Sequence, residues 1–228
     1  MRKFAILGLG TFGSSLAQAL TEKGAEVIAV DRQMERVEQI QDYVAVAVKL
    51  DSTDENALKA QGILEVDVAI VCIGEDFESN LLTSVLLKQM GVPLVITRAT
   101  KPIEEKILKA VGIDRVVLPE QESGERLAYS LMHPHFREIF FLGGQLSVIE
   151  LKTPANFVGK TLEEIQLRRK YGLNLVTIQR TYLEKNKKGE EKTKIQTMIP
   201  DAKTVIEKDD NLILVGNKAD IDKFLEKT

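Results

Sequence analysis

The sequence predicts an α/β fold, a doubly wound parallel Rossmann-like sheet followed by a small α+β domain. Three observations lead to this prediction. Short apolar runs, of the kind buried on both faces of a parallel sheet, alternate with amphipathic segments in the first half. A glycine-rich turn joins the first of these strands to a helix, and an acidic residue ends the second strand. The second half indicates hairpins and short helices instead.

The first strand and its turn carry a phosphate-binding motif. The apolar run 4–7 leads into Gly8, Gly10 and Gly13, which form G-x-G-x-x-G before a helix. The first glycine permits the tight turn, the second lets a phosphate approach the backbone, and the third lets helix and strand pack closely. Free N–H groups and the positive dipole end at the helix start would hold that phosphate.

The second strand adds the matching acid. Residues 27–30 form the strand and Asp31 ends it, about 20 residues past the glycines, where a carboxylate bonds the ribose hydroxyls. A lone glycine motif is a weak signal, and a glycine turn that binds nothing is the alternative. Because this one has its strand, helix and acid in place, we predict a nucleotide site.

The remaining first-half elements follow in alternation. We expect helices at 34–41, 54–60, 76–90 and 102–110, and strands at 44–48, 66–73, 94–97 and 116–118. Ser52 or Thr53 is the expected N-cap of the helix 54–60. Leu81, Leu82, Val85 and Leu86 are expected to form the apolar side of the helix 76–90.

Ligands in such folds bind outside the carboxyl ends of the strands. The side chains predicted there are Gly8 to Gly13, Asp31, Asp51, Ser52, Thr53, Ile73, Gly74, Arg98 and Glu120. Plain helix capping explains Asp51, Ser52 and Thr53 equally well. Arg98 is a basic side chain at a strand end, which favours a phosphate role.

Composition excludes several classes of protein. With a net charge of −3, no overall field attracts nucleic acid or an anionic membrane. The single cysteine, Cys72, lies in an apolar run, which indicates a buried thiol and rules out a disulfide framework. The chain starts directly in a strand, without a signal peptide, and contains no apolar run of the ~18–20 residues that span a bilayer. These features predict a soluble cytoplasmic protein.

The domain boundary is expected near a proline. A helix at 121–132, with Leu127, Ala128 and Leu131 on one face, ends at His133-Pro134-His135. A solvated turn explains these histidines better than a metal site. We therefore predict domains at 1–134 and 135–228.

The second domain is expected to be chemically plain. We predict a hairpin of 137–142 and 146–151, a helix at 162–167, a basic turn at 168–172, strands at 173–179 and 212–216, a turn at Asp209-Asp210, and a last helix carrying Ile221, Phe224 and Leu225. Residues 184–194 are expected to form a solvated hairpin tip. No acid/base pair, nucleophile or metal cluster is recognisable in this half.

Two functions fit this organisation. An NAD-dependent oxidoreductase would use the first domain for hydride transfer, but it needs an acid/base group near its substrate. A nucleotide-sensing regulatory module needs none, provided that its ligand binds two conformations with different affinity.

Several motifs resemble the RCK proteins, regulators of potassium conductance of the KtrA/TrkA type. Residues 4–13, 51–53, 73–74 and 118–120 are similar to the amino-terminal RCK domain. Residues 157–162, 167–175 and 209–216 are similar to the carboxy-terminal one. The resemblance therefore covers nearly the whole chain.

The resemblance implies a cytoplasmic gating subunit rather than an enzyme. It implies a homodimer assembled into an octameric ring on the inner face of the membrane, beneath a potassium-translocating subunit of the KtrB/TrkH type. The helix from Gln121 would cross over between protomers. Family members bind ATP, ADP or NAD(H) in the first domain, and no nucleic acid is implied.

The resemblance also implies a set of ligand residues. These are Gly8, Gly10, Thr11, Phe12, Gly13, Asp31, Arg32, Asp51, Ser52, Thr53, Ile73, Gly74, Asn80, Arg98 and Glu120. Asp31 would hold the ribose, residues 51–53 and Ile73 the adenine, and residues 10–13 and Arg98 the phosphates. Glu120 would face the phosphate or a divalent cation such as Mg²⁺ or Ca²⁺, and a helix-start carboxylate is the equal alternative.

Thr11 departs from the family pattern, which has arginine at this position. A hydroxyl supplies one hydrogen bond and no charge, whereas a charge-assisted contact is about twice as strong. Sharp discrimination of ATP from ADP is therefore not expected, and AMP, ADP or NAD become better candidates.

Some relatives bind cyclic di-AMP in the second domain. On that pattern Arg168, Asn174, Phe157 and Val158 would contact it. A basic turn with core residues explains the same four positions.

Overall fold

The computed structural model describes residues 1–132, 136–143, 146–185 and 191–227. The chain divides into two compact units, Met1–Glu122 and Ser123–Thr228, and each is described by itself. The predicted boundary at 134/135 stays a prediction. The predicted turn at His133-Pro134-His135 and the centre of the predicted hairpin tip, 186–190, lie outside the described residues.

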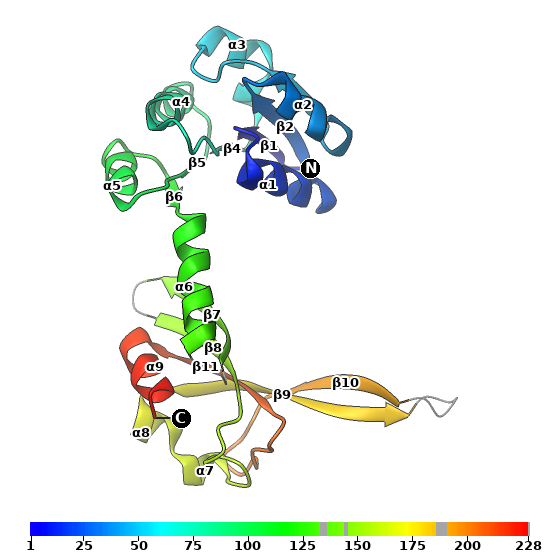
Figure 1. Ribbon diagram of the computed structural model, residues 1–228, viewed down its shortest axis with the longest axis vertical. Helices are drawn as coiled ribbons and strands as arrows, with labels where there is room; N and C mark the ends of the chain where they lie inside the picture. The colour runs from blue at the N-terminus through cyan, green and yellow to red at the C-terminus, as the bar shows by residue number, and fades with distance from the viewer. Residues whose placement is uncertain (133–135, 144–145, 186–190, 228) are drawn as a thin grey trace. The chain divides into compact units, whose positions relative to one another are not determined.

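Within the described residues, the first unit holds a six-stranded parallel sheet with the order β3-β2-β1-β4-β5-β6 (Figure 1). Its strands are β1 (Lys3–Leu7), β2 (Glu26–Asp31), β3 (Val46–Lys49), β4 (Val68–Val71), β5 (Val95–Arg98) and β6 (Arg115–Val117). The strand order reverses between β1 and β4, both of which pair with their neighbours in parallel. The predicted doubly wound sheet is confirmed, and in such a sheet this reversal marks the ligand crevice.

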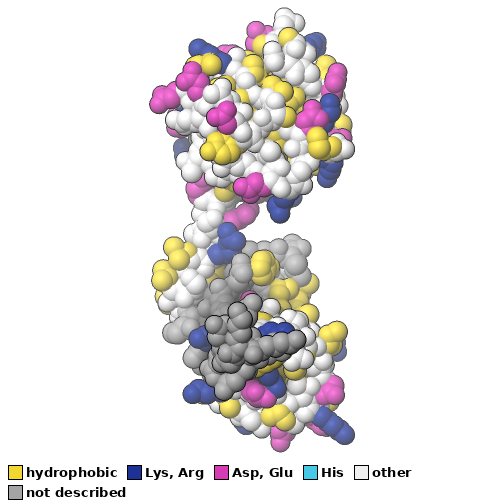
Figure 2. Space-filling view, turned by 90° about the vertical axis from the view of Figure 1, so that its right-hand side faces the viewer, with side chains coloured by type: hydrophobic (Ala, Val, Ile, Leu, Met, Phe, Trp, Pro, Cys, Tyr) yellow, Lys and Arg dark blue, Asp and Glu magenta, His cyan; other side chains and the backbone are white. Residues whose placement is uncertain are grey.

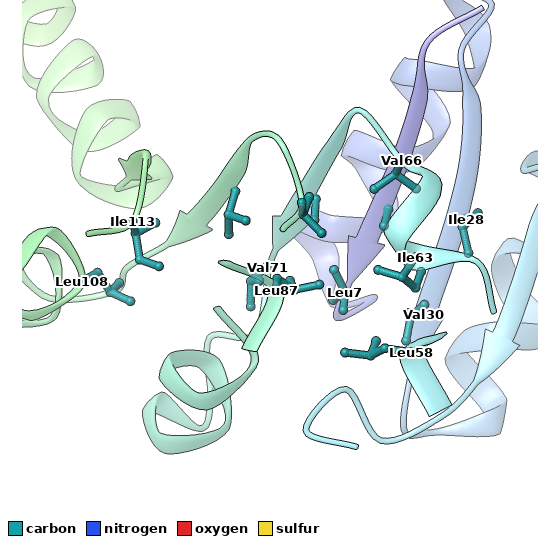
Figure 3. Packing of buried hydrophobic residues seen from close by; sticks show 14 of the residues in the cluster. Leu7, Ile28, Val30, Leu58, Ile63, Val66, Val71, Leu87, Leu108 and Ile113 are labelled. Carbon is teal, nitrogen blue, oxygen red and sulfur yellow. The ribbon is translucent and has the colours of Figure 1, made fainter. Parts of the chain in front are cut away.

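Helices cover both faces of this sheet. They are α1 (Thr11–Glu22), α2 (Met34–Ile40), α3 (Glu55–Ala60), α4 (Phe77–Gln89) and α5 (Pro102–Ala110), with 3₁₀ turns at Gln41–Tyr43 and Ile63–Glu65. Leu58, Leu87 and Leu108 of α3, α4 and α5 pack on one face, against Leu7, Val30 and Val71 (Figure 3). Ala17, Val37 and Ile40 of α1 and α2 pack on the other. These two apolar layers fix the strand ends that carry the site.

The predicted apolar face of α4 is confirmed in part, because Leu81 and Leu86 are partly buried and pack against the core, but the helix also buries polar side chains. Leu82 is 53% exposed, while Asn80, Thr83, Ser84 and Leu87 are buried. The small side chains are buried because they are hydrogen-bonded: Ser84 Oγ lies 2.9 Å from Thr97 Oγ1, and Ser52 Oγ lies 2.9 Å from Thr83 Oγ1. A polar contact layer therefore joins α4 to the sheet.

The N-cap of α3 is Asp54, so the expectation of Ser52 or Thr53 is wrong. The Asp54 carboxylate accepts hydrogen bonds from the N–H groups of Asn56 and Ala57. Ser52 bonds α4 instead, and Thr53 bonds Asp51. Aspartate satisfies free helix N–H groups as well as serine does, and its charge suits the helix dipole.

The second unit holds an antiparallel sheet, five-stranded in the described ranges, with the order β10-β9-β11-β8-β7. Its strands are β7 (Phe136–Gly143), β8 (Leu146–Lys152), β9 (Asn174–Lys185), β10 (Glu191–Met198) and β11 (Asn211–Asn217). Its helices are α7 (Leu162–Ile165), α8 (Leu167–Tyr171) and α9 (Lys218–Leu225). The predicted hairpin, last strand and last helix are confirmed.

One prediction for this unit is wrong in detail. The predicted basic turn at 168–172 is helix α8, because Leu167 is buried and Tyr171 packs edge-on against Phe224. Gly172, at a φ of 70°, ends that helix in the left-handed conformation. The hairpin expected at 184–194 is confirmed in the described residues on either side of 186–190, where β9 and β10 pair antiparallel from Lys185↔Glu191 onward.

Helix α6 (Pro119–Met132) begins in the first unit and continues in the second. Its predicted apolar residues Leu127 and Leu131 are 59% and 75% exposed. Tyr129 Oη donates to Asp222 Oδ1 of α9 at 2.9 Å, and Tyr129 packs beside the second core. The described helices include none long and apolar enough to cross a membrane.

Candidate nucleotide-binding site

A cavity of about 360 Å³ opens at the carboxyl ends of the first unit's strands. Its lining contains most of the predicted ligand residues: Gly8, Gly10, Thr11, Phe12, Asp31, Arg32, Asp51, Ser52, Ile73, Gly74, Arg98 and Glu120. It also contains residues not predicted from the sequence: Val30, Arg36, Leu50, Cys72, Glu75, Asp76 and Ser79. Gly13, Thr53 and Asn80 are near the lining but outside it.

The glycine turn has the geometry that its sequence predicts. Gly8 has a φ of 99°, a left-handed value that disfavours side chains. A Cβ on Gly13 would lie 1.9 Å from Gly8 O, so Gly13 supports the turn from behind. A Cβ on Gly10 would meet nothing within 4 Å. Among the described residues no side chain caps the first turn of α1, whose N-cap is Gly10. Its N–H groups are therefore available to an anion.

Asp31 connects this turn to the end of β2. Its side chain is buried, Oδ2 accepts from Leu9 N–H at 2.7 Å, and Oδ1 accepts from Gln33 N–H at 2.8 Å. Arg36 Nη1 lies 3.6 Å from Oδ2. Two backbone bonds thus orient the carboxylate at the cavity wall, in the position from which Rossmann acids bond a ribose.

Two ion pairs connect opposite sides of the cavity. Arg36 Nη2 lies 3.7 Å from Glu75 Oε1, and Arg32 Nη1 lies 4.0 Å from Asp76 Oδ2. Hydrogen bonds from Ser79 lower the pKa of Asp76, with a smaller contribution from Arg32. Sequence reasoning missed Arg36, Glu75 and Asp76. The helix-start aspartate of α4, directly after a predicted strand end, was the available signal.

Asp51, Ser52 and Thr53 form a local turn beside the cavity. Asp51 Oδ1 accepts from the Thr53 N–H at 3.0 Å and from its hydroxyl at 2.7 Å. The backbone bond from Thr53 is the main cause of the lowered pKa of Asp51. Asp51 and Ser52 line the cavity while Thr53 is turned toward Asp51.

Arg98 is held at the other end of the cavity. Its Nη2 donates to Glu120 Oε1 at 2.6 Å, and its Cζ lies 5.9 Å from the centre of the Phe12 ring. A Cβ on Gly74 would lie 2.7 Å from Arg98 Nη1, so the guanidinium lies against glycine backbone. Beneath it, Asn80 Nδ2 donates to the carbonyls of Ile73 at 2.6 Å and Arg98 at 3.0 Å. Asn80 therefore joins two strand ends without lining the cavity.

Cys72 behaves as the predicted core thiol. It is 3% exposed, and burial raises its pKa to about 12. A thiol with that pKa stays protonated at neutral pH, so it is a poor nucleophile.

A metal centre is not preformed in the described residues, where no group of three or more His, Cys, Asp or Glu side chains is close enough to hold an ion. Glu120 as a ligand of a divalent cation therefore stays a prediction.

The four residues predicted for a second ligand have different surroundings. Phe157 is buried, with ring centres 6.0 Å from Tyr171 and 5.9 Å from Phe224. Val158 is 40% exposed, and Arg168 in α8 and Asn174 in β9 are also exposed. A role in binding stays a prediction for each.

The second unit has a charged cluster of its own around Asp210, which the sequence places in a turn. Arg180 Nε and Nη2 donate to the two oxygens of the fully buried Asp210 carboxylate at 2.7 and 2.8 Å. Arg180 also pairs with Glu207, and these contacts, led by Asp210, raise the pKa of Arg180. The cluster connects β9 to the segment before β11.

Comparison with known families gives two matches. Residues 4–119 match the TrkA-N domain and residues 146–228 match the TrkA-C domain. The chain is 34% identical to the Ktr system potassium uptake protein C of Bacillus subtilis, over 98% of this chain and 96% of that protein. It is 30% identical to the Ktr system potassium uptake protein A of the same organism, over 98% and 95%.

Solved structures extend this comparison to the fold. The GsuK RCK domain is 24% identical, with a TM-score of 0.54, over 100% of this chain and 47% of that one. This chain therefore spans about half of the solved GsuK chain. The NAD(P)-binding domain of an exopolyphosphatase-related protein from Archaeoglobus fulgidus is 25% identical, with a TM-score of 0.51, over 58% of this chain and 98% of that one.

Proposed function

Because the chain belongs to the TrkA-N and TrkA-C family that includes the Ktr system potassium uptake proteins, we propose that it is a regulatory subunit of a potassium uptake system. We propose that it binds an adenine nucleotide in the first-unit cavity: ATP, ADP, AMP or NAD(H). The observation that carries the proposal is the buried Asp31 carboxylate, bonded to the glycine turn at the cavity wall, in a chain that is similar to a Ktr protein over 98% of its length.

The cavity supports one orientation of the ligand. The ribose hydroxyls bond Asp31, and the adenine lies toward Asp51, Ser52 and Ile73. The phosphates lie at the uncapped start of α1 and reach Arg98. This orientation uses the free N–H groups of α1 and the carboxylate that the turn orients.

The proposed activity is regulatory rather than catalytic. Its Ktr relatives are named as potassium uptake proteins. A ligand that binds two conformations of the first unit with different affinity shifts their populations without any bond-making. We propose that α6, which begins at Pro119, lines the cavity with Glu120 and continues into the second unit, passes on that shift.

The partner is proposed to be a membrane potassium-translocating subunit of the KtrB/TrkH type. We propose that the chain acts at the cytoplasmic face of the membrane, as a homodimer assembled into an octameric ring. The exposed apolar residues Leu127, Leu131 and Met132 of α6 support contact between protomers, since an exposed apolar patch is typical of a protein interface.

A thermal-shift panel of ATP, ADP, AMP, NAD, NADH and NADPH tests the ligand, with size-exclusion light scattering for the assembly. A ligand at a hundredfold excess over its Kd stabilises by about 2.7 kcal/mol. We expect adenine nucleotides to stabilise an assembly larger than a dimer. Stabilisation of a small oligomer by a reduced nicotinamide cofactor alone would favour an NAD-dependent oxidoreductase instead.

Potassium uptake tests the function itself. Cells that express a KtrB-type subunit together with this chain are expected to take up K⁺ faster than cells with the membrane subunit alone. Loss of that difference in an Asp31→Asn variant of the chain, at equal expression, would connect the cavity to uptake. Equal uptake with and without the chain contradicts the proposal.

Cyclic di-AMP in the second unit is a separate proposal, based on the family resemblance. Its exposed candidate contacts are Val158, Arg168 and Asn174. Calorimetry with cyclic di-AMP tests it, using Arg168→Ala as the variant and Arg169→Ala as the matched control. An absence of heat with the unaltered chain, under conditions where ADP binds, contradicts it.

A further inference from the structure

Arg98 has a carboxylate partner at the position where a ligand phosphate would lie. Arg98 Nη2 and Glu120 Oε1 are 2.6 Å apart, and both side chains line the cavity. A phosphate that bonds Arg98 therefore meets the negative charge of Glu120 at the same guanidinium. This arrangement makes the carboxylate and the phosphate competitors.

The side chains of Arg98 and Glu120 differ in how far they are exposed to solvent. The Arg98 side chain is 18% exposed, and it lies between the Gly74 backbone and the Phe12 ring. The Glu120 side chain is 59% exposed. An anion can thus displace Glu120 into solvent while Arg98 stays in place. Arg98 Nε is buried and has no hydrogen-bond partner among the described residues.

The other charged side chains of the cavity offset little of the negative charge of a ligand's phosphates. Among the described residues that line it, five carboxylates (Asp31, Asp51, Glu75, Asp76 and Glu120) outnumber three arginines (Arg32, Arg36 and Arg98). Arg32 and Arg36 are themselves paired with acids. Thr11, which lines the cavity at the start of α1, brings no charge. Each further phosphate therefore adds repulsion that only Arg98 and the α1 dipole offset.

We propose that Glu120 is a specificity-determining residue that competes with ligand phosphates for Arg98 and so favours nucleotides of low phosphate charge, AMP and NAD, over ATP. The inference rests on the proposed function and deepens it, because it selects among the nucleotides that the cavity would accept. It also gives Glu120 a role opposite to that of a cation ligand, which would favour the triphosphate.

Calorimetric titration of ATP, ADP, AMP and NAD into the full chain and into Glu120→Gln tests the proposal. Each titration is run in a chelating buffer and again with Mg²⁺. Glu122→Gln is the matched control, since it removes the same charge from the first turns of α6 outside the cavity lining. In chelator we expect Glu120→Gln to bind ATP about tenfold more tightly, with a smaller gain for ADP and about threefold or less for AMP and NAD.

Three results would overturn the proposal. If Glu120→Gln raises the affinity for all four nucleotides equally, or for none of them, Glu120 does not compete with phosphate charge. Weaker ATP binding by Glu120→Gln in Mg²⁺ identifies Glu120 as a cation ligand instead. If no nucleotide binds either the unaltered chain or the variant, the proposed function fails together with the inference, whereas binding with an unchanged preference removes the inference alone.

Discussion

In the described residues, each unit contains a buried aspartate beside an arginine, and the two aspartates have different roles. Asp210 in the second unit is fully buried, and Arg180 binds both of its oxygens. Asp31 in the first unit is 6% exposed, and its near bonds come from backbone N–H groups, with Arg36 farther away at 3.6 Å. Asp31 lines the first-unit cavity, whereas the Asp210 side chain has no contact with solvent.

The difference separates a structural carboxylate from a candidate ligand site. A carboxylate bound on both oxygens by one guanidinium has its charge neutralised within the fold. A carboxylate oriented by backbone and open to a cavity keeps acceptor capacity for a ligand hydroxyl. Burial and a charged neighbour are common to both, so neither identifies a functional aspartate by itself.

The largest expected effect is on the structural aspartate. Asp210→Ala leaves Arg180 without its main partner, which we expect to lower the free energy of unfolding of the second unit by about 3–5 kcal/mol. Urea unfolding followed by circular dichroism measures it, with Asp209→Ala as the neighbouring control. A loss below about 1 kcal/mol would show that Arg180 and Asp210 do not hold this unit together.

Gly13→Ala is expected to have the next largest effect, in the first unit. The new methyl group would lie 1.9 Å from Gly8 O, so the turn must shift, at a cost of about 3 kcal/mol in the free energy of unfolding. Thermal unfolding without ligand measures this loss. A variant as stable as the unaltered chain would contradict the tight packing of helix and strand.

Gly10→Ala should separate binding from folding. A Cβ there meets nothing within 4 Å, and the φ of −67° is open to alanine. We expect unfolding to change by less than about 0.5 kcal/mol and ADP affinity to fall roughly a hundredfold, about 2.7 kcal/mol, because the methyl group occupies the approach of the phosphate. If calorimetry shows unchanged ADP affinity, the phosphate does not bind at the glycine turn.

The smallest expected effect is on the pH dependence of the second unit's stability. Burial, followed by the hydrogen bond to Asp222, raises the pKa of Tyr129 to about 12 from its ordinary value of 10.0. The folded state therefore holds this proton more tightly than the unfolded state, so the stabilisation is complete below pH 10 and is lost as the pH rises toward 12. We expect this proton to contribute about 1 kcal/mol to the free energy of unfolding. Between pH 10 and pH 12 the Tyr129→Phe variant should therefore lose less stability than the unaltered chain. Equal losses in both proteins would contradict it.

The sequence predicts the parts of the fold that a local pattern determines. Runs such as 68–71 are apolar because both faces of their strands are buried. The spacing of Gly8, Gly10 and Gly13 before α1 follows from backbone geometry in the same way. The alternation of strands and helices, the glycine turn and the acid at the end of β2 follow from local patterns, so they could be predicted from the sequence alone.

The features that could not be predicted from the sequence depend on contacts between distant segments. Arg36 and Glu75 are 39 positions apart in the printed sequence, and they meet because β2 and β4, the strands that precede them, both pair with β1. The buried polar side of α4 depends on hydroxyl partners in other segments, such as Thr97 and Ser52. The sequence predicts only a turn at Asp210, because the bond from Arg180 of β9 depends on the fold. Pairing partners of this kind leave no periodic signal.

Hydrogen exchange of the full chain, with and without saturating ADP, tests the central claim most directly because it locates the ligand without any substitution. A nucleotide in the first-unit cavity is expected to slow exchange at the amides of residues 8–14, 31–33 and 73–76, at the turn and strand ends that line it. Protection confined to the second unit, or no protection by ADP, AMP or NAD at concentrations that saturate any site seen by calorimetry, would contradict the account.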